Sequence, residues 1–409
     1  MKIVFVNRFF HPDLAPTGLH AADVAFDLAA AGHEVHAVTS RLAYEGVGPG
    51  DGAGPGYAAQ ETVRGVQVHR VWTTRFGRGS LAGRALDYFS FYLSAFSVLA
   101  GLLNRNDIVV AKTDPPLISV VAAIAASMRG ARLVNWLQDV FPEAAARSGM
   151  RLLAGPLGAL ARVLRDWSVR RAVVNVVLGE RMAAEVGRLV PGARLRVVPN
   201  WADGTAIRPM AAGTSALRRE WGFEGKFVVG YSGNLGRVHD CETLLAAARL
   251  LAEERDIVFS FVGGGYHFAR LRAAALANVS VRGYVPGERL GESLAACDVH
   301  LVTLPPAFEG LIVPSKFYGV TAAGRAVIFV GDPDGEGARA ISAHGCGVTV
   351  STGDAAGLAA AIKDLRASPD KLRAMSERAR AAFEREWDKP IALARWREVI
   401  EAVEKSGAG

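Results

Sequence analysis

A glycine-rich stretch in the second half of the chain contains residue types that bind phosphate groups. Gly233, Asn234, Gly236 and Arg237 follow a strongly apolar segment and precede a segment expected to form a helix. Glycines let the backbone approach a ligand closely, and a helix N-terminus presents unpaired N–H groups that favour a diphosphate. Arg237 could add a charge-assisted contact. The same residues also suit a tight strand–helix turn without any ligand, and their types alone leave both interpretations open.

A second polar segment, 305–316, contains a carboxylate and a lysine after an apolar segment. Glu309 lies within it, and Ser315 and Lys316 end it. A lysine beside a diphosphate would stabilise the negative charge that develops as this group leaves, without a divalent cation. By residue type alone, Glu309 is more simply a solvated loop carboxylate and Lys316 a lysine on a helix surface.

Polar residues also follow apolar segments in the first half of the chain. His11 follows the first segment, Gly18 lies in the loop after it, and Lys112 and Asp139 end later segments. A carboxylate such as Asp139 could orient or deprotonate a substrate hydroxyl. Equally, Asp139 could cap a helix that begins near Pro142, and His11 could be merely exposed.

The elements that would position these residues follow a repeated strand–loop–helix pattern. In the first half, the predicted strands are 3–6, 35–39, 66–72, 108–111, 133–136, 174–178 and 195–198, and a helix at 19–31 stops at Gly32. In the second half, the predicted strands are 227–231, 257–262, 279–284, 299–304, 326–330 and 348–350, with a helix at about 239–253. This alternation predicts an α/β fold with parallel sheets covered on both faces.

We therefore expect two Rossmann-like, doubly wound domains that face each other across a cleft. The first comprises 1–199 and is completed by a C-terminal helix, 387–409, that packs back on it; the second comprises 200–386, with a linker around 200–226. Ligands of such sheets bind outside the carboxyl ends of the strands. Neither domain has G-x-G-x-x-G after its first strand, which argues against a dinucleotide-dependent dehydrogenase.

Composition narrows the class of protein further. The chain has 409 residues, a hydrophobic fraction of 50% and a formal net charge of +7, which suits a globular protein with anionic ligands or an anionic membrane surface. It contains no block of Lys and Arg residues of the kind that binds nucleic acid, so no nucleic-acid partner is expected. Its three cysteines lack metal-binding spacing, and no signal peptide is recognised, so we expect a cytoplasmic protein. A Gly/Pro-rich stretch, 46–56, predicts a surface loop.

Several motifs together resemble glycosyltransferase family 4, most closely its bacterial exopolysaccharide, O-antigen and colanic-acid branch. The motifs are spread over nearly the whole chain, at 7–13, 32–35, 135–143, 230–237, 305–316 and 323–328. The resemblance implies the GT-B fold, with an acceptor-binding first domain and a second domain that binds a nucleotide-sugar. It puts His11, Gly18 and Lys112 on the acceptor side, where the N–H group of Gly18 could approach the donor phosphate or the acceptor. Asp139 could there orient or deprotonate an acceptor hydroxyl.

The resemblance also assigns roles in the donor half-site. Glu309 matches the first glutamate of the family's E-x7-E pattern, which contacts the donor sugar. Lys316 matches the lysine of a Pro-Ser-Lys variant that faces the donor phosphates. The sequence departs from the family at the second glutamate, where counting gives Phe317 or Gly319, and Glu336 is a weak substitute for the missing ribose contact.

The family's nucleobase contacts lie near 282–285, where Tyr284 could stack on the base, but this segment does not separate uracil from guanine. A UDP-sugar is our first choice and GDP-mannose the alternative. The resemblance implies a retaining transfer, which needs no strong enzymic base. We therefore predict Glu309, Lys316 and Asp139 as the catalytic set, with no metal and no cofactor beyond the nucleotide-sugar substrate.

A long apolar segment, 86–103, follows a stretch rich in arginine, 75–84. It is slightly short and carries aligned serines, which argues against a membrane span. An interfacial helix beside the arginines would allow peripheral membrane contact through 75–103 and would suit a polyprenyl-diphosphate-linked acceptor. The alternative is a buried core helix of the first domain.

Other classes remain open at this point. A nucleotide-sugar 2-epimerase has the same two-domain architecture but needs no acceptor, and a synthase of the glycogen or sucrose type would act on soluble sugars. A non-catalytic protein that binds sugar nucleotides is the non-enzymic alternative. We favour a glycosyltransferase that transfers a sugar to a glycan or lipid-linked acceptor in cell-surface polysaccharide biosynthesis.

Overall fold

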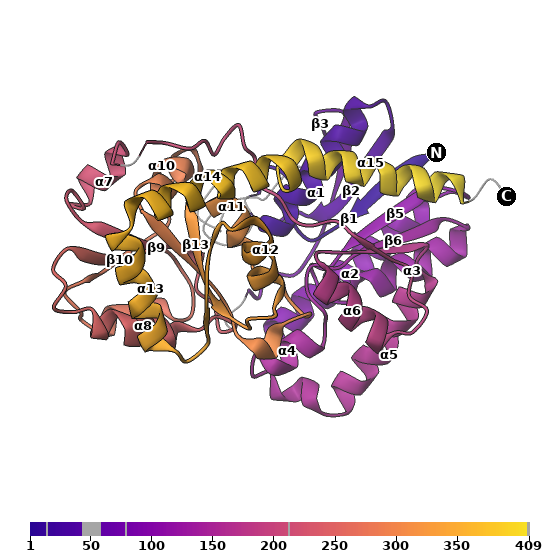
Figure 1. Ribbon diagram of the computed structural model, residues 1–409. Coiled ribbons are helices and arrows are strands. Elements are labelled where there is room, and N and C mark those ends of the chain that lie inside the picture. The colour runs from indigo at the N-terminus through magenta and orange to yellow at the C-terminus, as the bar shows by residue number, and fades with distance from the viewer. Residues whose placement is uncertain (14, 43–58, 78–79, 212, 407–409) are drawn as a thin grey trace. The chain divides into compact units, whose positions relative to one another are not determined.

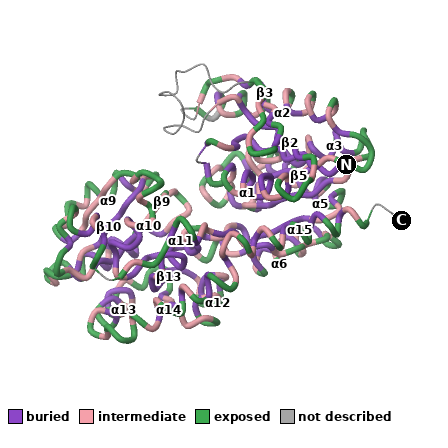
Figure 2. Tube along the Cα trace, turned by 90° about the horizontal axis from the view of Figure 1, so that it is seen from above, coloured by how far each residue is buried: buried purple, intermediate pink, exposed green. Residues whose placement is uncertain are grey.

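A computed structural model describes the chain except for residues 14, 43–58, 78–79, 212 and 407–409. The predicted loop at 46–56 therefore lies outside the described residues. The chain divides into two compact units, unit 1 with residues Met1–Val198 and Leu393–Gly409, and unit 2 with residues Pro199–Ala392. In both units the purple, buried segments of Figure 2 are chiefly strands and the helix faces that cover them.

Unit 1 contains an eight-stranded sheet with the order β3-β4-β2-β1-β5-β6-β7-β8. Its strands are β1 (Lys2–Val6), β2 (Glu34–Ser40), β3 (Gln60–Val63), β4 (Val66–Val71), β5 (Ile108–Lys112), β6 (Arg132–Trp136), β7 (Val174–Val177) and β8 (Leu195–Val197). All neighbours pair in parallel except β3, which pairs antiparallel with β4. The sequence prediction missed β3, a short edge strand whose residues alternate between exposed and half-buried.

The helices of unit 1 cover both faces of this sheet. They are α1 (Pro16–Ala30), α2 (Leu81–Leu102), α3 (Ile118–Arg129), α4 (Glu143–Arg147), α5 (Pro156–Arg171) and α6 (Glu180–Leu189), with a 3₁₀ turn η1 (Arg151–Ala154) before α5. Helix α1 begins three residues earlier than predicted, because Pro16 is compatible with the first helical position. Figure 1 shows α1 on one side of the sheet and α2, α3, α5 and α6 on the other.

The last helix, α15 (Lys389–Lys405), completes unit 1 from Leu393 onward. The indole of Trp396 packs against that of Trp136 at 4.2 Å between ring centroids, and both side chains are fully buried. Arg397 on α15 forms an ion pair with Asp27 on α1, which places the two helices on the same face.

Unit 2 contains a six-stranded parallel sheet with the order β11-β10-β9-β12-β13-β14. Its strands are β9 (Phe227–Asn234), β10 (Ile257–Gly264), β11 (Val279–Arg282), β12 (Val299–Leu304), β13 (Ala326–Gly331) and β14 (Gly347–Ser351). This order is that of Rossmann sheets, in which the first strand lies at the centre and the order reverses beside it.

The helices of unit 2 are α7 (Ala216–Glu220), α8 (Cys241–Leu250), α9 (Phe268–Ala273), α10 (Leu290–Ala295), α11 (Lys316–Ala322), α12 (Glu336–His344), α13 (Ala355–Ala367) and α14 (Pro369–Glu386), with the 3₁₀ turns η2 (Gly287–Arg289) and η3 (Pro306–Phe308). The predicted linker, 200–226, is instead part of this unit. Ile207 packs into a core cluster of unit 2, and Arg218 on α7 pairs with Asp298.

The order of each sheet reverses at one point, between β1 and β5 in unit 1 and between β9 and β12 in unit 2. At such a point two neighbouring strands lead to helices on opposite faces, and a crevice opens at their carboxyl ends. Most of the predicted donor residues lie at or after the ends of β9, β11, β12 and β13, and most of the predicted acceptor residues lie at or after the ends of β1, β5 and β6. The fold thus brings the ends of these strands to one edge of each sheet.

Candidate active site

Strand β9 continues three residues further than predicted and carries the start of the glycine loop inside the sheet. Gly233 pairs with Gly263, and Asn234 pairs with Gly264, on strand β10. Gly233 has φ of 117°, and a Cβ atom on Gly263 would lie 2.3 Å from the Gly233 carbonyl oxygen. Two glycine-containing strand ends therefore lie side by side, and the sequence analysis missed the second one, 263–265.

The expected helix N-terminus is not available to a ligand at Gly236. Helix α8 begins only at Cys241, and Asp240 caps it by accepting a hydrogen bond from the Thr243 N–H at 3.0 Å. The prediction that Gly236 opens the helix is therefore wrong. Within the described residues, however, the backbone N–H groups of Gly236, Arg237 and Val238 donate to no acceptor, so this loop still presents donors of its own.

Lys316 points toward the glycine loop rather than toward solvent. It is the first residue of α11, and its stem lies over Gly233, where an added Cβ would be 3.2 Å from the lysine Cε. The ammonium Nζ lies 3.1 Å from Nε2 of His239 and 5.3 Å from the ring centroid of Tyr231. The interpretation of Lys316 as a lysine on a helix surface is therefore wrong.

His239 connects this ammonium group to the sheet. Its Nδ1 lies 3.1 Å from the carbonyl oxygen of Thr303 on β12. Because a lysine ammonium can only donate, Nε2 of His239 accepts from Lys316, and the ring proton on Nδ1 is donated to Thr303. Sequence analysis missed His239 as a functional residue, because nothing near it in sequence indicates Lys316, which lies 77 positions away.

Burial lowers the pKa of both side chains. The pKa of Lys316 falls to about 8 because the ammonium group loses solvent. The pKa of His239 falls to about 3, first through burial and second through the positive charge of Lys316. At neutral pH the pair is therefore a charged lysine held by a neutral histidine, a cation ready for an anionic ligand.

Glu309 makes a backbone contact that the sequence analysis did not predict. One carboxylate oxygen, Oε2, accepts a hydrogen bond from the backbone N–H of Glu336 at 3.1 Å, at the first turn of α12. Gly335 allows this approach, because a Cβ at that position would lie 2.2 Å from the other oxygen, Oε1. Glu309 and Glu336 are thus neighbours at the ends of β12 and β13, and Glu309 stabilises the start of α12.

The remaining predicted donor residues lie along the same sheet edge. Tyr284 follows β11, is 68% exposed and would touch a Cβ added to Gly264, so its ring lies beside the second glycine-containing strand end. The guanidinium carbon of Arg237 lies 4.2 Å from the ring centroid of the exposed Tyr266. Ser315 is exposed immediately before Lys316 and does not cap α11 through its side chain.

In unit 1, the residues around the β1/β5 reversal are brought together in part. Oγ1 of Thr17 donates to Oδ2 of Asp114 at 3.4 Å. Asp139 keeps some exposed surface, but desolvation of its carboxyl group and, second, the negative charge of Asp114 raise its pKa to about 6. Asp139 does not cap α4, whose N-cap residue is Pro142, so the capping alternative is wrong.

Two predicted acceptor contacts are not supported, and a third is altered. Lys112 is buried, with its Nζ 3.5 Å from the ring centroid of Trp136, so it cannot reach an acceptor directly. His11 packs edge-on against Phe26, and burial lowers its pKa. Gly18 lies inside α1, where its missing Cβ lets the helix approach the backbone of Phe9 and Phe10. It therefore serves helix packing.

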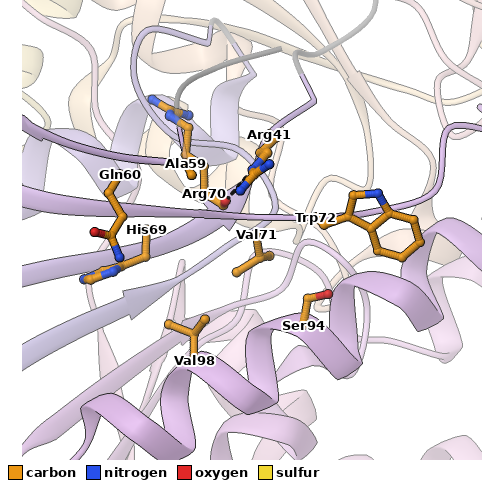
Figure 3. A pocket seen from close by; sticks show the side chains of 9 residues that line it. All are labelled: Arg41, Ala59, Gln60, His69, Arg70, Val71, Trp72, Ser94 and Val98. Carbon is orange, nitrogen blue, oxygen red and sulfur yellow. Dashed lines mark hydrogen bonds between the residues drawn. The ribbon is translucent and has the colours of Figure 1, made fainter. Parts of the chain in front are cut away.

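A cavity of about 420 Å³ lies elsewhere in unit 1, at the ends of β2 and β4 and against α2 (Figure 3). It is lined by Arg41, Trp72 and Ser94 among others, and an adjoining cavity of about 310 Å³ shares Arg41 and Trp72. The Arg41 guanidinium donates through Nε to the Arg70 carbonyl at 3.0 Å. None of the predicted site residues lines either cavity, so this basic, aromatic site was missed.

Comparison with known proteins decides the family. Residues 17–201 match a glycosyl transferase 4-like domain, and residues 226–368 match the glycosyl transferases group 1 domain. The chain is 30% identical over 297 residues to the probable glycosyltransferase WbjE of Pseudomonas aeruginosa, covering 71% of this chain and 74% of that protein. The chain belongs to glycosyltransferase family 4. The putative colanic acid biosynthesis glycosyl transferase WcaI of Escherichia coli is 26% identical over 339 residues, covering 79% and 82%.

Solved structures of low sequence identity have the same fold. A sucrose-phosphate synthase from Thermosynechococcus elongatus has a TM-score of 0.78 at 15% identity, covering 99% of this chain and 100% of that one. Anabaena Alr3699/HepE in complex with UDP-glucose has a TM-score of 0.69 at 18% identity, covering 98% and 100%. The predicted GT-B class is confirmed, and this family 4 enzyme is a glycosyltransferase.

Proposed function

We propose that this enzyme is a retaining glycosyltransferase that transfers a sugar from a nucleoside-diphosphate sugar, with UDP preferred, and that it needs no divalent cation. The observation that carries the proposal is the buried Lys316 ammonium, held by His239 over Gly233 at the β9/β12 reversal. A cation fixed before the substrate arrives stabilises charge on a leaving diphosphate without reorganisation during the reaction. The UDP-glucose complex of Alr3699/HepE supports the choice of UDP by analogy of fold only.

The proposed transfer keeps the reacting groups on one face of the sugar. The bond between C1 and the diphosphate oxygen breaks while the acceptor hydroxyl oxygen forms its bond to C1. The acceptor proton passes to the departing phosphate oxygen, so no side chain has to act as a strong base. Lys316 and the N–H groups of 236–238 receive the charge that builds up on the diphosphate.

Metal independence is part of this proposal and rests on Lys316 as the substitute charge. Within the described ranges, no three His, Cys, Asp or Glu side chains gather as metal ligands do. A divalent ion held chiefly by the substrate would still be compatible with that arrangement. Turnover in the presence of a chelator is therefore the direct measurement.

We propose an amphipathic, phosphate-bearing acceptor, such as a polyprenyl-diphosphate-linked glycan of cell-surface polysaccharide synthesis. Support comes from the cavity at Arg41 and Trp72, which combines a cation for phosphate with an exposed indole for a sugar ring and lies against the apolar helix α2 (Figure 3). Peripheral contact of 75–103 with the inner face of the cell membrane belongs to the same proposal. Arg78 and Gly79 of that stretch lie outside the described residues.

The proposal is tested with UDP-sugars, lipid-linked acceptors and EDTA, with product anomers assigned by NMR. We expect release of UDP that requires an acceptor, continues in EDTA and yields a product with the donor's anomeric configuration. An inverted product or loss of turnover in EDTA would contradict the mechanism. Nucleotide release without any acceptor would favour the epimerase alternative, and binding without turnover for any donor would favour the non-catalytic alternative.

A further inference from the structure

The outward face of helix α2 is apolar and uncovered. Leu86, Phe89 and Leu93 are 51%, 59% and 55% exposed, whereas Phe91 and Ala95 on the opposite side are fully buried in the core of unit 1. Among the described helices, α2 alone is long and apolar enough to cross a membrane by length and composition. Only 22% of its apolar window is buried, so α2 is not an ordinary core helix.

The two helices beside α2 continue this apolar surface. Helix α3 packs against both α2 and α5, so the three helices form one layer, which Figure 1 shows on one side of the sheet. Met128 on α3 is 64% exposed, and Leu160 and Val163 on α5 are 54% and 64% exposed. In the turn before α5, Leu152 is 63% exposed.

We define the apolar helix face as the exposed large hydrophobic side chains of this layer, namely Leu86, Phe89, Leu93, Ile124, Met128, Leu152, Leu157, Leu160, Val163 and Trp167. Eighteen such side chains are exposed among the described residues, and ten of them belong to this face. Unit 2 contributes only four. Apolar residues of a soluble surface are normally scattered, so this concentration indicates an interaction surface.

The charges around the apolar helix face have one sign. Helices α2, α3 and α5 and the turn η1 carry seven arginines against two acids, Asp87 and Asp166. Asp87 is buried, and Asp166 is paired with Arg165 at 2.6 Å. Arg151 and Arg170 are exposed. A surface of hydrophobic side chains interleaved with arginine matches an anionic lipid interface.

We propose that the apolar helix face rests on an anionic lipid bilayer. The sequence indicated membrane contact for α2 alone, and the structure extends this contact to α3, η1 and α5. This inference rests on the proposed function in one respect: a lipid-linked acceptor gives the enzyme a reason to contact a membrane. A second copy of the chain is the competing occupant. Two such faces brought together would oppose arginine with arginine, whereas anionic lipid neutralises them.

The packing of α2 indicates how the chain would sit on the bilayer. Its inner side packs against β2 and β4 as part of the core of unit 1, so the helix cannot leave the sheet to span a membrane without exposing that core. The face would therefore lie in the headgroup region, with its hydrophobic side chains in the outer part of the acyl layer.

Vesicle flotation with the full chain tests the proposal. The parent protein is mixed with phosphatidylcholine vesicles that either contain or lack phosphatidylglycerol. We expect binding that needs the anionic lipid and weakens with added salt. The double variant Leu160→Glu/Val163→Glu, which leaves α2 intact, should lose roughly tenfold in vesicle affinity, because two apolar side chains are replaced by anions at an anionic surface.

The matched control is Leu250→Glu, an equally exposed leucine in unit 2 at 59%, which should leave vesicle binding unchanged. All variants should keep the parent's melting temperature and its turnover with a water-soluble acceptor, so failure of this inference is separable from failure of the proposed activity. Vesicle binding by the double variant equal to that of the parent would overturn the role of α5. A lipid-free dimer of the parent that the double variant abolishes would assign the face to a second copy instead.

Discussion

At the residue scale, the central feature is a lysine whose neighbours keep it both charged and positioned. His239 is neutral and accepts from Lys316, while the Tyr231 ring face lies beneath the ammonium group. Burial costs the ammonium group solvation, which lowers its pKa to about 8. The negative charge of an incoming diphosphate would compensate for this loss of solvation. The site is therefore suited to an anion before any substrate is bound.

The lowered pKa predicts how UDP affinity depends on pH. Lys316 binds a diphosphate in its protonated form, so affinity should be constant near pH 7 and fall as pH rises through about 8, by up to tenfold per pH unit. The groups facing it do not titrate in this range, because the pKa of His239 is about 3 and that of Tyr231 is raised well above its usual value. Calorimetric titration with UDP between pH 7 and 10 measures the profile.

The control for this profile is Lys316→Arg, which stays charged throughout the range. It should remove the loss of affinity above pH 8, even if its absolute affinity differs. A profile that is the same in the parent and in Lys316→Arg would assign the titration to another group.

His239 is predicted to position Lys316 rather than to contact substrate. Replacing it by alanine removes the acceptor at Nε2, and the misplaced ammonium group should lower kcat by roughly 10- to 100-fold. His239→Asn or His239→Gln, which can still accept from Lys316, should restore part of the activity and the pH profile of UDP binding. His344→Gln, a half-buried histidine at the far end of α12, is the control. Unchanged kcat in His239→Ala would remove His239 from the account.

At the scale of elements, a loop glutamate and a helix form one structure. Glu309 follows β12 and holds the N-terminus of α12 through the Glu336 N–H, in the space that Gly335 leaves. A carboxylate at a helix N-terminus satisfies a backbone donor and opposes the helix dipole. The family motif predicts that Glu309 contacts the donor sugar. The hydrogen bond from the Glu336 N–H gives Glu309 a structural role in addition to that predicted contact.

Two substitutions separate these roles. Glu309→Gln keeps an acceptor for the Glu336 N–H and should cost less than about 1 kcal/mol in the free energy of unfolding, whereas Glu309→Ala should cost about 1–2 kcal/mol. If the carboxylate also contacts the donor sugar, kcat should fall in both variants. Urea unfolding and initial rates measure the two effects. Full activity in Glu309→Gln would leave Glu309 with the structural role alone.

The sequence predicted most of these elements, because apolar runs between glycine and proline breaks follow directly from burial in a parallel sheet. It did not predict β3, whose edge position leaves no apolar pattern, or the length of β9, whose last residues pair through glycines. Nor could it reveal His239, since contacts between the ends of β9 and β12 depend on strand order rather than on nearby residues. For 86–103 the sequence left an interfacial helix and a buried core helix both open, because the apolar residues of α2 occur on both faces.

At the scale of the whole molecule, the chain passes from unit 1 to unit 2 at Val198–Pro199 and returns at Ala392–Leu393. The returning helix is part of the unit 1 core, because Trp396 packs on Trp136, which in turn covers the buried Lys112. Each unit has its own sheet and its own core clusters. Stability of unit 1 and donor binding by unit 2 should therefore respond to different substitutions.

Trp396→Ala tests this division. Loss of a fully buried indole should destabilise unit 1 by about 3–5 kcal/mol, seen as a lower melting transition in calorimetry. UDP affinity, measured below that transition, should stay within about twofold of the parent, because Lys316 and the glycine loop lie in unit 2. An equal loss of stability and UDP affinity would show that the two units do not behave independently.

The most direct test of the central claim is calorimetric titration of UDP into the parent protein and into Lys316→Met at pH 7. If the Lys316 ammonium over Gly233 holds the diphosphate, the parent should bind UDP and the variant should bind it roughly 10- to 100-fold more weakly. This ratio corresponds to the free energy of one charge-assisted hydrogen bond in a partly buried site. The melting temperature should be unchanged or slightly raised, because a costly buried charge is removed. Equal UDP affinity in the two proteins would contradict the account.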